Sequence, residues 1–283
     1  GNAATNVTFP LVVLAIGFSL LLGDGAAAFY SIKLGENNKE EGSKAIGNAI
    51  LLLGVLGLIF LSVGYIFIEN MLWSFGATAA NISYALDYMK IILIGFPFMI
   101  FACGLNSIIR ADGSPEYSMA AMIVGAVINI ILDPIFIFIF HMGVTGAAIA
   151  TVIGQIISCI ISVSYMRKFK NINFKRSILK FDKNISKTIM SFGISSLITQ
   201  VAVTLIIIVS NNALAYYGAE SIYGSDIPIS SMGIVMKVNE ILISIVIGIA
   251  VGGQPILGYN YGARNFKRVK DTYFMIIKIA TIV

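Results

Sequence analysis

Long apolar stretches, separated by short polar ones, follow one another along the whole chain. Eight such stretches occur, near residues 5–32, 45–68, 85–108, 117–140, 145–166, 188–216, 230–259 and 271–283. A helix needs about 20 mostly apolar residues to cross the hydrocarbon core of a bilayer. The last stretch is incomplete, because 13 residues of helix extend only about 20 Å. The pattern predicts an all-α integral membrane protein.

The overall composition supports this prediction. Hydrophobic residues make up 58% of the chain and charged residues 12%, and the mean hydropathy is +0.90. A soluble globular domain holds about 45–50% apolar and about 25% charged residues. The 27 glycines suit the close helix packing that membrane bundles use. The formal net charge of +5 does not by itself indicate a nucleic-acid partner.

Lysine and arginine are concentrated in every second loop. The loops at 33–44, 109–116, 167–187 and 260–270 hold three, one, eight and four basic residues, whereas those at 69–84, 141–144 and 217–229 hold none. Loops rich in Lys and Arg stay on the cytoplasmic side of a membrane. The alternation therefore supports the helix assignment and predicts that residue 1 lies on the outer side.

A weak internal repeat links the two halves of the chain. The stretch at 25–38 aligns with the stretch near 253–266 at an offset of 227 residues (262 minus 35). This offset pairs Gly25 with Gly252, Gly35 with Gly262 and Asn38 with Asn265. A parallel repeat of six-helix halves explains the match. It leads us to expect one further helix before this chain and three after it.

A carboxylate and an amide lie inside one apolar stretch, "VINIILDPIFIF" (127–138). An ionised carboxylate in hydrocarbon costs about 2.5–3.5 kcal/mol on insertion scales, so it persists where it faces a cavity, a partner or an ion. Asn129 and Asp133 are four residues apart and share one helix face. We therefore expect Asp133 to bind H⁺ or Na⁺.

Thr151 belongs to the same predicted site. Asp133 lies ten residues before the loop at Gly143 and Thr151 eight residues after it, so both are at similar depth in the membrane. Such neutral and charged oxygens are the ligands that a hard cation prefers. Pro134 would kink the helix beside the site or free a carbonyl group. The alternative is that Asp133 only satisfies backbone groups near this kink.

Four other polar side chains are candidates for the transport pathway or a lobe interface. Lys237 and Glu240 are three residues apart and would also neutralise each other on one helix face. Asp24 lies nine residues from Lys33, about 14 Å from the cytoplasmic surface by helical rise. It therefore lines the pathway or reaches its aqueous entrance. Gln200, like Asn211 and Asn212, is expected to form hydrogen bonds between helices.

The sequence lacks the common motifs of enzymes and of resident cofactors. It has no Walker A loop, HExxH motif or nucleophile elbow, and each of these has a recognisable pattern. The cysteines Cys103 and Cys159 lie in apolar stretches and His141 stands alone in a loop. They are therefore expected to be structural and not metal ligands. We expect neither an enzyme nor a cofactor, apart from a coupling ion.

Two segments resemble the multidrug and toxic compound extrusion (MATE) family. "RADGSPEYSMAAMIVGAVINIILDPIFIFIFHMGVTGAAIATVIGQ" (110–155) resembles the family's helices 4 to 6, and "GGQPILGYNYGARNFKRVK" (252–270) resembles the motif after its eighth helix. The resemblance covers the chain and implies helices 2 to 9 of a twelve-helix, two-lobe bundle. Residues 1–166 would form the N-terminal lobe without helix 1, 167–187 a basic cytoplasmic linker, and 188–283 the start of the C-terminal lobe (helices 7 to 9).

The resemblance also implies a function. Members export organic, often cationic or amphiphilic compounds across the plasma membrane in exchange for H⁺ or Na⁺, and a monomer is expected. In one branch the cation site maps onto Asn129, Asp133 and Thr151, with a further Asp on helix 1. Another branch uses a Glu on helix 7, but 188–216 contains no acidic residue.

Two other classes of membrane protein stay open as alternatives. The first is a lipid-linked oligosaccharide flippase of related architecture, which would line its cleft with cations for pyrophosphate. Lys237 is the one plausible candidate for such a cation. The second is a membrane receptor or scaffold that transports nothing.

Overall fold

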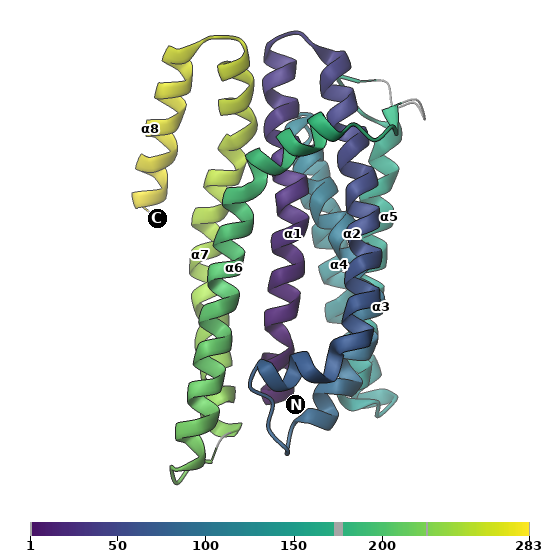
Figure 1. The fold of residues 1–283 in the computed structure, drawn as a ribbon, viewed down its shortest axis with the longest axis vertical. Coiled ribbons are helices and arrows are strands. Elements are labelled where there is room, and N and C mark those ends of the chain that lie inside the picture. The colour runs from purple at the N-terminus through teal and green to yellow at the C-terminus, as the bar shows by residue number, and fades with distance from the viewer. Residues whose placement is uncertain (1, 173–177, 225, 283) are drawn as a thin grey trace.

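The protein folds as a bundle of long helices, seen in a computed structural model that describes residues 2–172, 178–224 and 226–282. The α-helices in this part of the chain are α1 (Asn2–Gly35), α2 (Lys39–Ser74), α3 (Ile82–Ala111), α4 (Pro115–Pro134), α5 (Gly143–Ser164), α6 (Lys183–Ala219), α7 (Asp226–Gly262) and α8 (Phe266–Ile282). A π-helical turn, η1 (Ile135–Ile139), follows α4, and a 3-10 turn, η2 (Tyr165–Arg167), follows α5. Helix α6 starts beside α2, crosses α1 obliquely and continues alongside α7 (Figure 1).

Seven of these helices, α1 to α7, are long and apolar enough to span a membrane. They correspond to the first seven stretches predicted from the sequence. Helix α8 has 17 residues and begins at Phe266, before the predicted start at 271. The fourth stretch, expected over 117–140, is helical over Pro115–Ile139, with the π-helical turn η1 following α4 directly after Pro134. Proline removes a backbone donor and crowds the preceding turn, and such π-turns occur within otherwise α-helical segments.

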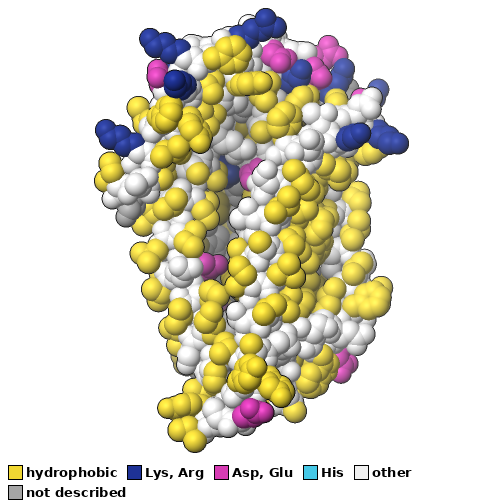
Figure 2. Space-filling model, turned by 60° about the vertical axis from the view of Figure 1, so that its left-hand side comes forward, with side chains coloured by type: hydrophobic (Ala, Val, Ile, Leu, Met, Phe, Trp, Pro, Cys, Tyr) yellow, Lys and Arg dark blue, Asp and Glu magenta, His cyan; other side chains and the backbone are white. Residues whose placement is uncertain are grey.

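The loops alternate between the two ends of the bundle, as the charge pattern predicts. The α1–α2, α3–α4, α5–α6 and α7–α8 connections lie at one end, and the N-terminus lies at the other (Figure 1). We call the first the basic end, because it holds the Lys- and Arg-rich loops, and Figure 2 shows basic side chains gathered there. Lys175 and Arg176, counted in the predicted linker, lie outside the described residues. Hydrophobic side chains cover the long sides, as a lipid-facing surface requires.

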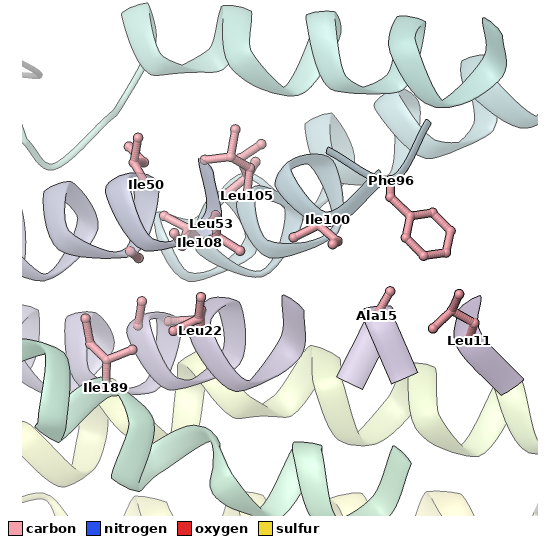
Figure 3. Packing of buried hydrophobic residues seen from close by; sticks show 14 of the residues in the cluster. Leu11, Ala15, Leu22, Ile50, Leu53, Phe96, Ile100, Leu105, Ile108 and Ile189 are labelled. Carbon is pink, nitrogen blue, oxygen red and sulfur yellow. The ribbon is translucent and has the colours of Figure 1, made fainter. Parts of the chain in front are cut away.

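Helix α1 lies at the centre of the bundle and packs against α2, α3, α6 and α7. Leu53 of α2 and Phe96, Ile100 and Leu105 of α3 are fully buried, and Phe96 and Ile100 point toward α1 (Figure 3). By contrast, the most apolar window of α7 has none of its residues buried. The core therefore lies between α1, α2 and α3.

The internal repeat reappears in the geometry of two loops at the basic end. Asn37 and Arg264, which are 227 residues apart, both adopt a left-handed backbone, with φ of 59° and 56°. The next residue in each loop is an asparagine whose side chain accepts a backbone N–H three residues further on: Asn38 from Glu41 and Asn265 from Arg268. The repeat therefore holds at the level of hydrogen bonds.

The repeated residues also meet each other where α1 crosses α7. A Cβ atom on Gly35 would lie 2.1 Å from the carbonyl oxygen of Tyr259, and one on Gly262 would lie 2.0 Å from that of Ile32. Gly35 and Gly262 are equivalent positions of the repeat. Only glycine permits so close an approach of two helix backbones. Two equivalent positions of the repeat therefore lie at the same helix crossing.

A buried carboxylate attaches the segment after η2 to the α3–α4 connection. Asp112, 1% exposed, accepts hydrogen bonds from the hydroxyls of Tyr30 (2.6 Å) and Tyr165 (2.8 Å). It also accepts the backbone N–H groups of Lys170 (2.7 Å) and Asn171 (3.3 Å). A buried carboxylate is stable when it is hydrogen-bonded in this way. Asp112 therefore holds Lys170 and Asn171 against the α3–α4 connection.

We predict that Asp112→Ala releases this segment and destabilises the protein. Each buried donor left without an acceptor costs about 1–3 kcal/mol. Trypsin should cleave after Lys168 and Lys170 faster than in the unmodified protein, and the midpoint of thermal unfolding in detergent should fall. Glu116→Ala, which changes an exposed acidic side chain in the first turn of α4, is the control and should change neither measurement. Equal cleavage rates in the two variants would contradict the role of Asp112.

Candidate functional site

The structure brings Asn129, Asp133 and Thr151 together between α4 and α5. The side-chain nitrogen of Asn129 donates to Asp133 Oδ1 at 3.2 Å and to Thr151 Oγ1 at 3.4 Å. Thr151 Oγ1 in turn donates to the carbonyl oxygen of Ala147 at 2.9 Å. The three predicted residues therefore form one connected polar group inside a membrane-spanning bundle.

A close crossing of two glycines sets this geometry. A Cβ atom on Gly125 of α4 would lie 2.7 Å from the carbonyl oxygen of Gly154, and one on Gly154 of α5 would lie 2.6 Å from that of Gly125. Asn129 is one helical turn beyond Gly125, and Thr151 is one turn before Gly154. Because α4 and α5 run in opposite directions, these two side chains come opposite each other.

Asp133 stands at the edge of this group, half-buried, immediately before Pro134 and the π-helical turn. Asn129 presents its NH₂ group to both neighbouring oxygens. A cation at this point would require the Asn129 side chain to turn over, so that its carbonyl oxygen faces Asp133 and Thr151. The group would then supply three oxygen atoms, which suits a hard cation such as Na⁺. Proton binding would need the Asp133 carboxylate alone.

A cavity of about 640 Å³ lies beside the site. Residues of α1, α3, α4, α5 and α7 line it, and Asn129 and Thr151 form part of its wall, but Asp133 does not. Most of the wall is apolar, with Ile16, Leu20, Met99, Met122, Ile247 and Val251 among its residues. A mainly apolar cavity with a few polar groups is typical of sites for small organic molecules.

The cavity contains polar residues that sequence reasoning missed. Gln155 lines the wall, and its side-chain oxygen is buried without a hydrogen-bond partner among the described residues. Its position, four residues after Thr151 on the same helix face, was a signal that could have identified it. Arg110 also lines the cavity, although the sequence pattern assigned it to a loop.

Asp24 lies in this cavity too, and not at an aqueous entrance. Its side chain is buried at the basic end, with 8% of the residue exposed. Ser107 donates to its Oδ1 atom at 2.7 Å, and Arg110 lies 3.9 Å from the same oxygen. Of the two positions that the sequence left open, the structure therefore supports the one along the cavity wall.

The other predicted residues take different positions. Lys237 and Glu240 are both exposed on α7, and no ion pair joins these two described residues, so the expected neutralisation is wrong. Exposed charges gain little from pairing.

Gln200 packs where α6 meets α1, at Gly17. Asn211 accepts a hydrogen bond from Asn6 at 3.2 Å, and Asn212 donates one to the Ser74 carbonyl at 3.1 Å. The two asparagines therefore join helices as predicted.

Comparison with known proteins supports the resemblance seen in the sequence. The model of the MatE family matches residues 3–135 and 195–283. The multidrug export protein MepA of Staphylococcus haemolyticus (strain JCSC1435) is 31% identical over 282 residues, which are 99% of this chain and 61% of that protein. The chain thus spans less than two thirds of the length of this relative.

Solved structures share the fold. One described as protein A has a TM-score of 0.92 and 34% identity, and the match covers 100% of this chain and 62% of that one. The outward-facing conformation of a multidrug resistance MATE family transporter has a TM-score of 0.86, 24% identity and coverage of 98% and 60%. The family match extends over more than half of the chain. The chain therefore belongs to the MatE family, whose members are multi-pass membrane transporters and not enzymes.

Proposed function

We propose that this chain forms the ion-coupled part of a secondary antiporter that exports organic compounds in exchange for H⁺ or Na⁺. The observation that carries the proposal is the contact of Asn129 with both Asp133 and Thr151 beside a cavity of about 640 Å³. The name of the MepA relative, a multidrug export protein, supports the same class of activity.

The coupling step takes place at Asp133. While the carboxylate is ionised, it accepts the Asn129 amide hydrogen bond. A proton on Asp133 weakens this bond, and a sodium ion replaces it by drawing the Asn129 oxygen toward itself. Either ion thereby changes the contact between α4 and α5 next to the cavity. An ion drives a transition only if it binds the two conformations with different affinity, and a contact between helices that changes with ion binding meets this condition.

The exported compound occupies the cavity. Its wall offers apolar and methionine side chains, which adapt to ligands of different shape, together with amide and hydroxyl groups. This lining favours amphiphilic organic compounds, and the carboxylate of Asp133 beside the cavity favours those with a positive charge. We assign residues 1–166 to the N-terminal lobe, 167–187 to the linker and 188–283 to the C-terminal lobe. Movement of one lobe against the other gives the cavity access first to one side of the membrane and then to the other.

One observation disfavours a lipid-linked oligosaccharide flippase. A cavity that binds pyrophosphate requires unbalanced positive charge. The basic side chain in the cavity wall, Arg110, lies 3.9 Å from the carboxylate of Asp24, so the pair supplies none. Lys237 is exposed on α7 and does not line this cavity.

Transport in proteoliposomes that contain the full-length protein tests the proposal. A fluorescent organic cation is placed in the compartment from which the protein exports it. A pH gradient and a sodium gradient are imposed in separate experiments. We expect export to be accelerated by at least one gradient and stopped when that gradient is collapsed with an ionophore. Export that is independent of both gradients would refute ion-coupled antiport.

A further inference from the structure

At the basic end of the cavity, one carboxylate links helices that belong to opposite proposed lobes. Asp24 of α1 accepts a hydrogen bond from Ser107 of α3 on its Oδ1 atom (2.7 Å) and one from Ser196 of α6 on its Oδ2 atom (2.9 Å). Arg110 of α3 donates to Ser107 Oγ at 3.0 Å and lies 3.9 Å from Asp24 Oδ1. The backbone carbonyl of Asp24 accepts the side chain of Gln254 from α7 at 3.3 Å. Four helices therefore meet at this residue.

The backbones of α1 and α6 approach each other closely at the same place. A Cβ atom on Gly25 of α1 would lie 2.1 Å from the carbonyl oxygen of Ile189, and one on Gly193 of α6 would lie 1.8 Å from that of Leu21. Gly25 adjoins Asp24, and Gly193 lies three residues before Ser196. The two glycines therefore allow α6 to come close enough for Ser196 to reach the carboxylate. This contact lies next to Asp24 in the cavity wall.

The bonds of Asp24 divide into two sets. Ser107 and Arg110 belong to α3, which packs along α1 in the same proposed lobe. Ser196 and Gln254 belong to α6 and α7 of the other proposed lobe. If the lobes separate at the basic end, the carboxylate keeps its partners on α3 and exchanges the Ser196 hydroxyl for water. A buried carboxylate that keeps one set of partners and replaces the other with water loses little stabilisation. Such a contact can therefore open reversibly.

From this arrangement we infer that Asp24 and Ser196 form a latch that holds the basic end of the cavity closed, with Arg110 as the residue that keeps the Asp24 carboxylate in place. The latch opens when the cavity turns toward the side of the basic loops. The inference rests on the proposed transport function. It gives a role to Asp24, which lies apart from the Asn129, Asp133 and Thr151 group but lines the same cavity as Asn129 and Thr151.

Cys103 provides a reporter for the latch. It lines the cavity one helical turn deeper than Ser107, and this chain contains only one other cysteine, Cys159. In a protein with Cys103 as its sole cysteine, a membrane-impermeant maleimide is added from the side of the basic loops or from the opposite side. The variants are Ser196→Ala, which removes only the bond from α6, and Asp24→Asn. Ser195→Ala, at an exposed neighbouring serine, is the matched control.

We expect both variants to label about 10-fold faster from the basic side, since a hydrogen bond to a charged group shifts an equilibrium by this order. Labelling from the opposite side should become slower. Unchanged rates in Ser196→Ala would refute the latch, and faster labelling from both sides would show general loosening instead. The labelling needs no ion gradient, so its failure leaves the antiport proposal standing. Conversely, gradient-independent export would refute antiport without affecting the labelling result.

Discussion

Asp133→Asn is expected to reduce ion-driven export by at least about 10-fold, the size of effect that the loss of a single essential interaction of about 1.4 kcal/mol produces. Asparagine has nearly the same shape but carries no charge and binds no proton near neutral pH. It therefore cannot alternate between an empty and an ion-bound state. The side-chain oxygen of the new asparagine can still accept the hydrogen bond from Asn129, which is 3.2 Å long in the unmodified protein. The variant should therefore still fold and reach the membrane.

Three comparisons make this measurement decisive. Asp87→Asn changes an exposed acid on α3 and should leave export unchanged, which controls for loss of surface charge. Asp133→Glu keeps the charge and should retain part of the export activity. The amount of each variant in the membrane, measured by quantitative blotting, separates transport from expression. Full ion-driven export by Asp133→Asn at normal abundance would remove Asp133 from the coupling site.

Gly262→Ala is expected to lower both the stability and the activity of the protein. A methyl group on Gly262 would lie 2.0 Å from the carbonyl oxygen of Ile32, so α1 and α7 must move apart where the two repeats meet. Overpacking of this kind costs about 1–3 kcal/mol. Since the obstructing atom belongs to a helix backbone, no side-chain rearrangement can relieve the clash.

The same helix offers a matched control. Gly252→Ala places its methyl group in open space, with no other atom within 4 Å, and glycine-to-alanine changes inside a helix usually stabilise by about 0.5–1 kcal/mol. The two substitutions should therefore shift the thermal unfolding midpoint in detergent in opposite directions. If Gly262→Ala were as stable and active as Gly252→Ala, the crossing of α1 and α7 would not be an obligatory contact.

Local pattern explains why much of the fold was predictable. The apolar stretches identify the seven spanning helices, because water-free surroundings require every backbone group to bond within its own helix. Asn129 and Asp133 share a face through helical periodicity alone, and Thr151 follows from an equal distance to the next loop. The two loops at Asn37 and Arg264 have the same geometry because the backbone conformation of a short loop depends on the residues next to it in the sequence.

The contacts of Asp24 show why other features were not predictable. Ser107 and Ser196 are separated from it by 83 and 172 residues, and no local pattern states which helices become neighbours. The anchoring of the α5–α6 connection by Asp112 has the same origin, since Tyr30 lies 82 residues away from it. Lys237 and Glu240 illustrate the reverse case: spacing suggested a pair, yet both side chains point outward and stay apart.

By itself, the sequence determined the spanning segments, the end of the bundle that holds the basic loops, the internal repeat and the Asn129, Asp133 and Thr151 group. These depend on hydrophobicity, charge and periodicity over one or two helices. Only the tertiary structure decided that a cavity lies beside the group, that Asp24 and Arg110 line it, and that Gly35 meets Gly262. Each of these depends on how closely two distant helices approach, and that distance is set by the packing of all of them at once.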